Sequence, residues 1–206
     1  MSEILAEITA RRAYRAIVPE PIPRPDVEMM VQAAHLAPSC FNYQPWRFVA
    51  IDDPAILTQL HGMLGSTNPW MRHSPVIIAV ASHRDLDCKS SDNRDYFMFG
   101  CGMAVGFLMI QATRMGYIAH PVAGYKPLPV KALLKIPENY TLITLINVGR
   151  HGTDVSLLND EQKEQETGHR IRKPIEEVFS WNEFRMPDLV KRQWNPGSTQ
   201  SHKELT

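Results

Sequence analysis

The chain has 206 residues, which suits one domain of ordinary or slightly large size. Hydrophobic residues make up 44% of it and charged residues 21%, a globular composition that excludes a disordered or fibrous protein. Its 22 Lys and Arg residues are matched by 22 Asp and Glu residues. With no net charge, neither a nucleic acid nor an anionic membrane is favoured as a partner.

Two helices are predicted near the start, joined by a proline-rich connector. Apolar residues between positions 4 and 8 have helical spacing and lead into an arginine-rich stretch at 11–15. Four prolines between positions 19 and 25 then enforce an extended connector. Asp26 can cap the second helix, which runs through about Leu36.

The rest of the chain alternates short apolar runs with helical patterns. Strands are predicted at 46–51, 76–81, 118–123 and 142–148, and helices at 54–64, 95–115, 129–135 and near 174–179. Residues 159–168 are polar and resemble a mobile loop, and 195–206 resemble a solvated arm. Few strands among many helices predict an α+β or α/β layered fold with a small sheet between helices.

The longest apolar run, residues 96–110, predicts a buried core helix. Its 15 residues are fewer than the roughly 20 that cross a bilayer. It is not a dinucleotide-binding loop, because Val105 stands where the G-x-G-x-x-G pattern needs its third glycine. Gly102 and Gly106 lie on one helix face, where small residues let another helix approach closely in the core or across a subunit contact.

Cysteine and histidine patterns argue against disulfide, metal and hydrolase chemistry. Cys40, Cys88 and Cys101 form no C-x-x-C pair, so we expect no disulfide scaffold or zinc site and a reducing compartment. Residues 1–13 show no secretory apolar segment, and a cytoplasmic location is predicted. No H-E-x-x-H, G-x-S-x-G or Walker motif is present.

Two arginine clusters are candidate anion sites. Arg11, Arg12 and Arg15 fall within five residues, and Arg170 and Arg172 would share one side of an extended chain. Guanidinium groups suit two-pronged contact with phosphate. The alternative is a solvated basic surface in each case.

The segment 37–46, Ala-Pro-Ser-Cys-Phe-Asn-Tyr-Gln-Pro-Trp, is the most informative. It holds hydroxyl and amide side chains between two prolines, in a loop that follows a helix and precedes a strand. Such a loop presents polar groups rigidly, although it could be only an ordered connector.

Taken in order, these motifs resemble the nitroreductase family of flavin-dependent oxidoreductases. The resemblance covers about residues 5–180 and rests on the stretch 11–15, the segment 37–48, the glycine-rich helix at 100–106, Pro-Val-Ala-Gly-Tyr at 121–125, the strand at 142–149 and Arg-Ile-Arg-Lys-Pro at 170–174. It implies a three-layer α+β fold with a small mixed or antiparallel sheet. It also implies a flavin domain over 1–180 and a tail over 181–206 that is extended or packed on a partner subunit.

The resemblance further implies a homodimer that binds FMN at its interface and a hydride transfer from NAD(P)H to a nitroaromatic, quinone or other small oxidant. Arg11, Arg12, Arg170 and Arg172 would hold the phosphate and Arg15 the pyrimidine edge, while Ala13 replaces the usual serine. Ala123 and Gly124 would present backbone N–H groups to the ring, and Pro38, Ser39 and Asn42 would come from the partner subunit. Asn68 or Arg72 could add a pyrimidine contact. No side chain need be catalytic, and no metal is expected.

Three alternatives remain open at this stage. A specialised flavin enzyme of the same fold, such as a reductive dehalogenase or a flavin-cleaving enzyme, would need lid residues that the sequence does not identify. A flavin-binding module without turnover is the second. In the third, the arginine clusters bind RNA or an acidic protein and no flavin is present.

Overall fold

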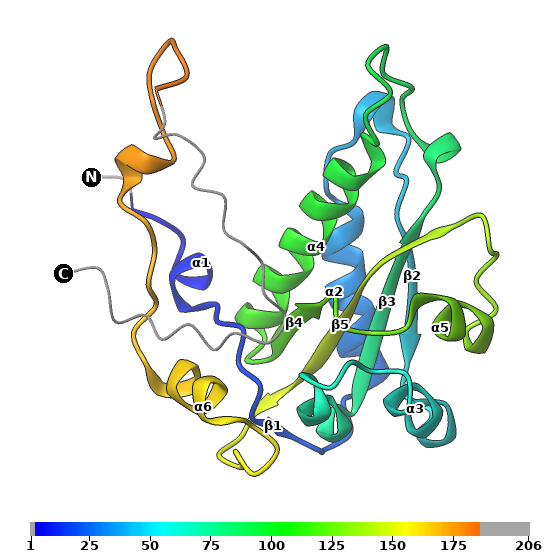
Figure 1. Ribbon diagram of the computed structural model, residues 1–206, viewed down its shortest axis with the longest axis vertical. Helices are drawn as coiled ribbons and strands as arrows, with labels where there is room; N and C mark the ends of the chain where they lie inside the picture. The colour runs from blue at the N-terminus through cyan, green and yellow to red at the C-terminus, as the bar shows by residue number, and fades with distance from the viewer. Residues whose placement is uncertain (1–2, 186–206) are drawn as a thin grey trace. The chain divides into compact units, whose positions relative to one another are not determined.

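The computed structural model describes residues 3–185 and divides them into two units between Gly168 and His169. The first unit holds all strands and α-helices of the described residues (Figure 1). The strands are β1 (Ile17–Val18), β2 (Arg47–Ile51), β3 (Val76–Ser82), β4 (Ile118–Val122) and β5 (Thr141–His151). The α-helices are α1 (Ala6–Ala10), α2 (Arg24–His35), α3 (Pro54–His61), α4 (Phe97–Arg114), α5 (Pro127–Leu133) and α6 (Asp160–Thr167). Short 3-10 turns are η1 (Cys40–Asn42), η2 (Pro69–His73), η3 (Arg84–Leu86) and, in the second unit, η4 (Ile175–Glu177).

The sheet is antiparallel throughout and is organised around β5. One edge of β5 pairs with β3, which in turn pairs with β2. β5 also pairs with β4 and, near its end, with β1. All four predicted strands are present, while β1 was not predicted because two residues carry no periodic pattern.

Alternation along β3 shows how the sheet separates two cores. Every residue of β3 is buried. Val76, Ile78 and Val80 join the core under α2 and α4. Ile77 and Ala79 face the other way and join the core under α3, α5 and η2. The first unit therefore has three layers, helix, sheet and helix, as the α+β prediction required (Figure 1).

Helix boundaries follow local capping, with one correction. Asp53 accepts hydrogen bonds from the backbone N–H groups of Ala55 and Ile56, at 2.8 and 3.0 Å, which starts α3 at Pro54 as expected. The second helix does not begin after Asp26. It starts two residues earlier at Arg24, and the Asp26 carboxylate instead accepts a 2.6 Å hydrogen bond from the Tyr117 hydroxyl.

Helix α4 confirms the predicted core helix, but its glycines Gly102 and Gly106 do not pack in the core, which leaves the predicted subunit contact untested. It is long and apolar enough to cross a membrane by length and composition, yet residues such as Cys101, Ala104 and Leu108 are fully buried against the sheet and α2. A Cβ at Gly102 or Gly106 would meet no atom within 4 Å. Among the described residues, therefore, no second helix uses the gap that these glycines leave.

The prediction about the cysteines is wrong. Cys40 and Cys88 form a disulfide across 48 positions of sequence, and only Cys101 of the three is a free thiol. Two strand-separated loops bring the pair together, which residue spacing could not reveal. The cysteine argument for a reducing compartment therefore fails, and the cytoplasmic location stays a prediction.

The second unit starts at His169, eleven positions before the end of the predicted flavin domain at residue 180. Its short turn η4 lies within the helix predicted near 174–179. Most of the predicted tail, 186–206, and with it the arm at 195–206, lies outside the described residues.

Candidate functional site

A buried carboxylate on α6 holds the end of the arginine-rich segment 11–15. Glu166 on α6 is 5% exposed, and its two oxygens accept the backbone N–H of Arg15 at 3.0 and 3.2 Å. The same carboxylate accepts the N–H of Ala16 at 3.1 Å and lies 3.1 Å from Nε2 of His151. Its contacts satisfy backbone groups and so fix the path of the chain just where Arg15 leaves it.

Two arginines of this segment, Arg12 and Arg15, have different surroundings. Arg12 donates from Nη2 to the carbonyls of Gln165 and Gly168, at 3.0 and 2.7 Å, at the C-terminal end of α6. Its guanidinium also lies 5.1 Å from the centre of the Tyr14 ring. Arg15 is half-buried, and burial lowers the pKa of its guanidinium although Glu166 and Glu161 oppose the shift. Arg15 is thus a partly desolvated cation, which an anionic ligand would stabilise.

A second group of contacts holds the backbone at Gly124, just after β4. The Gly124 carbonyl accepts the N–H of Gly65 at 2.7 Å and the side-chain amide of Asn68 at 3.0 Å. A Cβ on Gly124 would lie only 2.6 Å from that amide nitrogen, so no other residue fits without displacing Asn68. Asn68 therefore acts on Gly124 with its amide, while Arg72, the other residue considered there, is exposed.

Helix α6 joins these two groups. Gln162 and Glu166 are one turn apart and both are buried. While Glu166 holds Arg15, Gln162 donates from Nε2 to the carbonyl of Thr67 at 2.9 Å, beside Asn68. The predicted mobile loop at 159–168 is therefore wrong, because this segment is the helix that braces the arginine segment against the Gly124 loop.

A signal for α6 was present in the sequence. Asn159 and Gln162 form a capping box, in which the Asn159 side chain accepts the N–H of Gln162 at 2.9 Å and the Gln162 side chain accepts the N–H of Asn159 at 3.1 Å. An Asn followed three residues later by Gln marks a helix start. Neither Glu166 nor Gln162 was predicted to matter for the site.

His120 on β4 lies between these groups and stays neutral. Its Nδ1 is 3.0 Å from the Tyr14 carbonyl, and its ring packs on Trp70 with 4.8 Å between ring centres. Burial lowers the pKa of His120 from 6.5 to about 4, and the charges of Arg15 and Arg11 add to the effect. His120 therefore adds no positive charge beside the arginines at neutral pH.

The depressed pKa of His120 predicts a loss of stability in mild acid. Between pH 6.5 and 4 the unfolded chain binds a proton at this position and the folded chain does not, so stability falls as the pH drops through this interval. The shift corresponds to about 3 kcal/mol. Urea unfolding at pH 7 and pH 4.5 should show a smaller acid loss for His120→Gln than for the parent chain. Equal losses in the two proteins would contradict this assignment.

The remaining predicted residues lie elsewhere. Pro38, Ser39 and Asn42 fall on the turn after α2, at the end of the first unit remote from the connection between α1 and β1 (Figure 1). There Ser39 Oγ accepts the N–H of Gln44 at 2.9 Å. One chain does not bring this turn to the arginine segment.

The roles predicted for four further residues stay untested. Ala13 and Ala123 are exposed on the first unit. Arg170 and Arg172 are exposed in the second unit, and their convergence with Arg11 and Arg12 on one phosphate stays a prediction.

Comparison with known proteins identifies the fold and its relatives. The sequence profile of the Nitroreductase family matches residues 8–67 and 58–150. A protein of Archaeoglobus fulgidus named as an NADH dehydrogenase/NAD(P)H nitroreductase is 27% identical over 154 residues, covering 72% of this chain and 86% of its own. An iodotyrosine deiodinase of Haliscomenobacter hydrossis is 26% identical over 169 residues, covering 68% and 75%. A crystal structure described as an oxidoreductase containing FMN superposes with a TM-score of 0.79 at 27% identity, covering 90% of this chain and 95% of its own.

Proposed function

Because this chain belongs to the nitroreductase family, we propose that it is an FMN-dependent oxidoreductase that uses NAD(P)H to reduce a nitroaromatic, a quinone or another small oxidant. One observation carries the proposal: α6 contacts both segments. Glu166 binds the backbone of Arg15, and Gln162 binds the backbone beside Asn68, which holds Gly124. Bound FMN would supply the redox chemistry by accepting a hydride and passing its electrons on.

The residues present fit this cofactor. Arg15 is a partly desolvated cation, which suits the pyrimidine edge where negative charge gathers on the reduced ring. Gly124 offers a backbone edge without a side chain, and hydrogen bonds from Asn68 and Gly65 to its carbonyl fix its position. Arg11 would bind the phosphate. The protein's part is to orient the ring and set its electrostatics, with no side chain acting as nucleophile or base.

We propose that a second copy of the chain completes the site. Within one chain, Pro38, Ser39 and Asn42 lie at the end of the first unit away from the arginine segment (Figure 1). Helix α4 also carries a partly exposed apolar face, on which Phe99 is 56% and Phe107 42% exposed and Gly102 and Gly106 are open. A homodimer built on this face would use the close approach that the glycines allow and would bring the partner's turn to the flavin.

The proposal is tested by an absorbance spectrum of the purified protein followed by anaerobic addition of NADH and then NADPH. Flavin bands that bleach on addition support the proposal, and the nucleotide that reacts faster is the preferred donor. Bound flavin that neither nucleotide bleaches would contradict the reductase function. A protein that takes up no FMN on reconstitution would contradict flavin binding altogether.

Replacing Arg11 with alanine should weaken FMN binding by about 1.5–3 kcal/mol, the range for a hydrogen bond to a charged group. Titration of apo-protein with FMN, followed by flavin fluorescence, measures the effect. Arg24→Ala is the matched control, because Arg24 is an exposed arginine on α2 whose guanidinium pairs with Asp52 at 2.7 Å. An unchanged dissociation constant for Arg11→Ala would remove Arg11 from the site.

Reductive dehalogenation is a second candidate, favoured by the relative named as an iodotyrosine deiodinase. Anaerobic assays that compare iodotyrosine with a nitroaromatic separate the two. Release of iodide at a rate equal to or above nitro reduction would favour the dehalogenase, and nitro reduction alone would favour the leading proposal.

A further inference from the structure

The turn that carries Ser39 and Asn42 is covalently tied to a loop far along the chain. Cys40, the first residue of η1, forms the disulfide with Cys88, which lies between η3 and α4. The disulfide therefore clamps two of the residues proposed to face the flavin of the partner subunit.

The clamped turn has an unusual backbone. Phe41, Asn42 and Gln44 have φ values of 43°, 58° and 51°. Positive φ is uncommon outside glycine, and for a bulky residue such as Phe41 it is a true outlier that persists only where the surroundings enforce it. Phe41 is 87% exposed, so packing of its side chain does not enforce the conformation. Two contacts of the turn can: the 2.9 Å hydrogen bond from the Gln44 N–H to Ser39 Oγ, and the adjacent disulfide, which is the covalent one.

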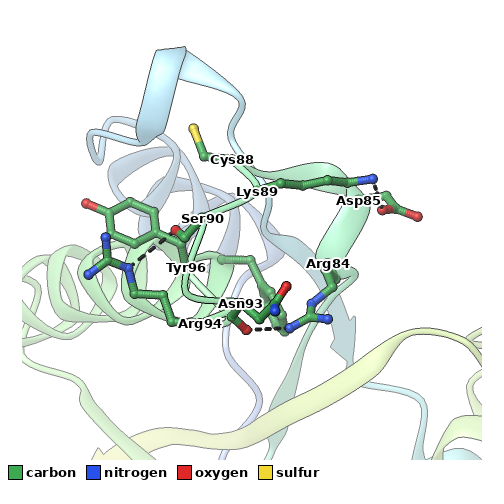
Figure 2. A pocket seen from close by; sticks show the side chains of 9 residues that line it. Arg84, Asp85, Cys88, Lys89, Ser90, Asn93, Arg94 and Tyr96 are labelled. Atoms are coloured by element: carbon green, nitrogen blue, oxygen red, sulfur yellow. Dashed lines mark hydrogen bonds and ion pairs between the residues drawn. The ribbon is translucent and has the colours of Figure 1, made fainter.

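The disulfide is accessible to a small reductant. Cys88 lies on the wall of two pockets, one of about 180 Å³ next to Arg94 and Tyr96 and one of about 420 Å³ next to Phe41 and Tyr43. Figure 2 shows the Cys88 sulfur on the rim of the smaller pocket, pointing away from Tyr96. An attacking thiolate would reach Cys88 first.

The site also contains an acceptor for the reduced state. Asp87 is 6% exposed, and its Oδ2 has no hydrogen-bond partner among the described residues. This carboxylate and the two sulfurs lie within 4.8 Å of one another. A buried carboxylate oxygen without a donor is costly, and a cysteine S–H formed on reduction would supply one to Oδ2.

We propose that the Cys40–Cys88 disulfide is a thiol-reducible clamp that controls FMN binding. A dithiol attacks Cys88 Sγ, the S–S bond breaks, and the Cys40 sulfur leaves with the electron pair and takes a proton. The second thiol of the reagent then closes its own disulfide and releases Cys88 as a thiol, so two protons and two electrons pass to the cysteines. Freed of its tie, the turn relaxes from positive φ, and Ser39 and Asn42 leave the position that contacts the flavin.

The inference rests on the proposed flavin function, and the test separates the two. Full-length protein is treated with dithiothreitol or left oxidised, desalted anaerobically into buffer with EDTA, and titrated with FMN, while thiols are counted with Ellman's reagent. We expect the reduced chain to bind FMN about fivefold more weakly or worse, in the range typical of coupled sites. The Cys40→Ala/Cys88→Ala variant is the matched control, with weak binding that dithiothreitol does not change.

Each outcome decides one of the two proposals. Equal FMN affinity in the oxidised and reduced chains, with the thiols shown to be free, would overturn the clamp and leave the flavin function standing. Failure to bind FMN in either state would overturn the flavin function itself. Asp87→Asn keeps an oxygen that accepts the Cys88 N–H but replaces the Oδ2 acceptor with an NH₂ group. A larger fraction of this variant should therefore stay oxidised in a fixed glutathione buffer. An unchanged oxidised fraction would remove Asp87 from the clamp.

Discussion

Gly124→Val is expected to give a protein that folds but purifies without flavin. A Cβ at this position would lie 2.6 Å from the Asn68 amide nitrogen, well inside the closest approach that side chains show. The Asn68 amide would have to move, and its 3.0 Å hydrogen bond to the Gly124 carbonyl would break. The two branches of valine would also project over the backbone edge offered to the ring. The constraint is one of space, since Gly124 is not among the residues with positive φ.

Three measurements on Gly124→Val check this explanation. The ratio of flavin to protein absorbance should fall to near zero, the FMN dissociation constant should rise beyond measurement, and far-UV circular dichroism should stay close to that of the parent. Gly62→Val is the matched control, because the nearest atom to a Cβ there is the Gln59 carbonyl oxygen at an ordinary 3.4 Å. A Gly124→Val protein that retains a full complement of flavin would show that the Pro-Val-Ala-Gly-Tyr segment lies outside the site.

The strands and the core helices could be predicted because each carries a strong local signal. β3 is an unbroken β-branched and apolar run, and α4 is an apolar run too long for a strand. Helix α6 could not be predicted from periodicity, because its sequence Asp-Glu-Gln-Lys-Glu-Gln-Glu-Thr has no apolar face. It is held by two buried polar side chains, Gln162 and Glu166, whose partners lie 95 and 151 residues away along the chain.

The candidate site likewise contains residues that the sequence could predict and residues that it could not. Arg11, Arg15 and Gly124 stand in motifs that the sequence displays directly. The structure connects Arg15 to α6 through Glu166, and it connects the segment that holds Gly124 to α6 through Gln162. The residues that hold them, Glu166 and Asn68, act on backbone groups far away in sequence. A carboxylate that accepts two backbone N–H groups has no signature in the chain that donates them, so such residues emerge only when the fold is known. The Cys40–Cys88 pairing was missed for the same reason.

Glu166→Ala is therefore the most direct test of whether α6 holds the arginine segment. It should lower the free energy of unfolding by about 3–5 kcal/mol. The substitution leaves the N–H of Arg15 and the buried N–H of Ala16 without an acceptor and removes the partner of His151. Because Arg15 is no longer fixed where it leaves the backbone, FMN affinity should fall as well. Urea unfolding measures the first effect and flavin titration the second.

Two variants on the same helix separate the role of the Glu166 carboxylate from a general destabilisation of α6. Glu166→Gln keeps the shape and one acceptor oxygen, so it should lose about 1–2 kcal/mol and recover much of the flavin affinity. Glu164→Ala changes an exposed side chain of α6 and should leave both quantities within about 0.5 kcal/mol of the parent. If Glu166→Ala and Glu164→Ala unfold at the same urea concentration, the carboxylate does not hold the arginine segment. If it loses stability but binds FMN as tightly as the parent, α6 supports the fold alone, and Arg15 reaches its position by other contacts.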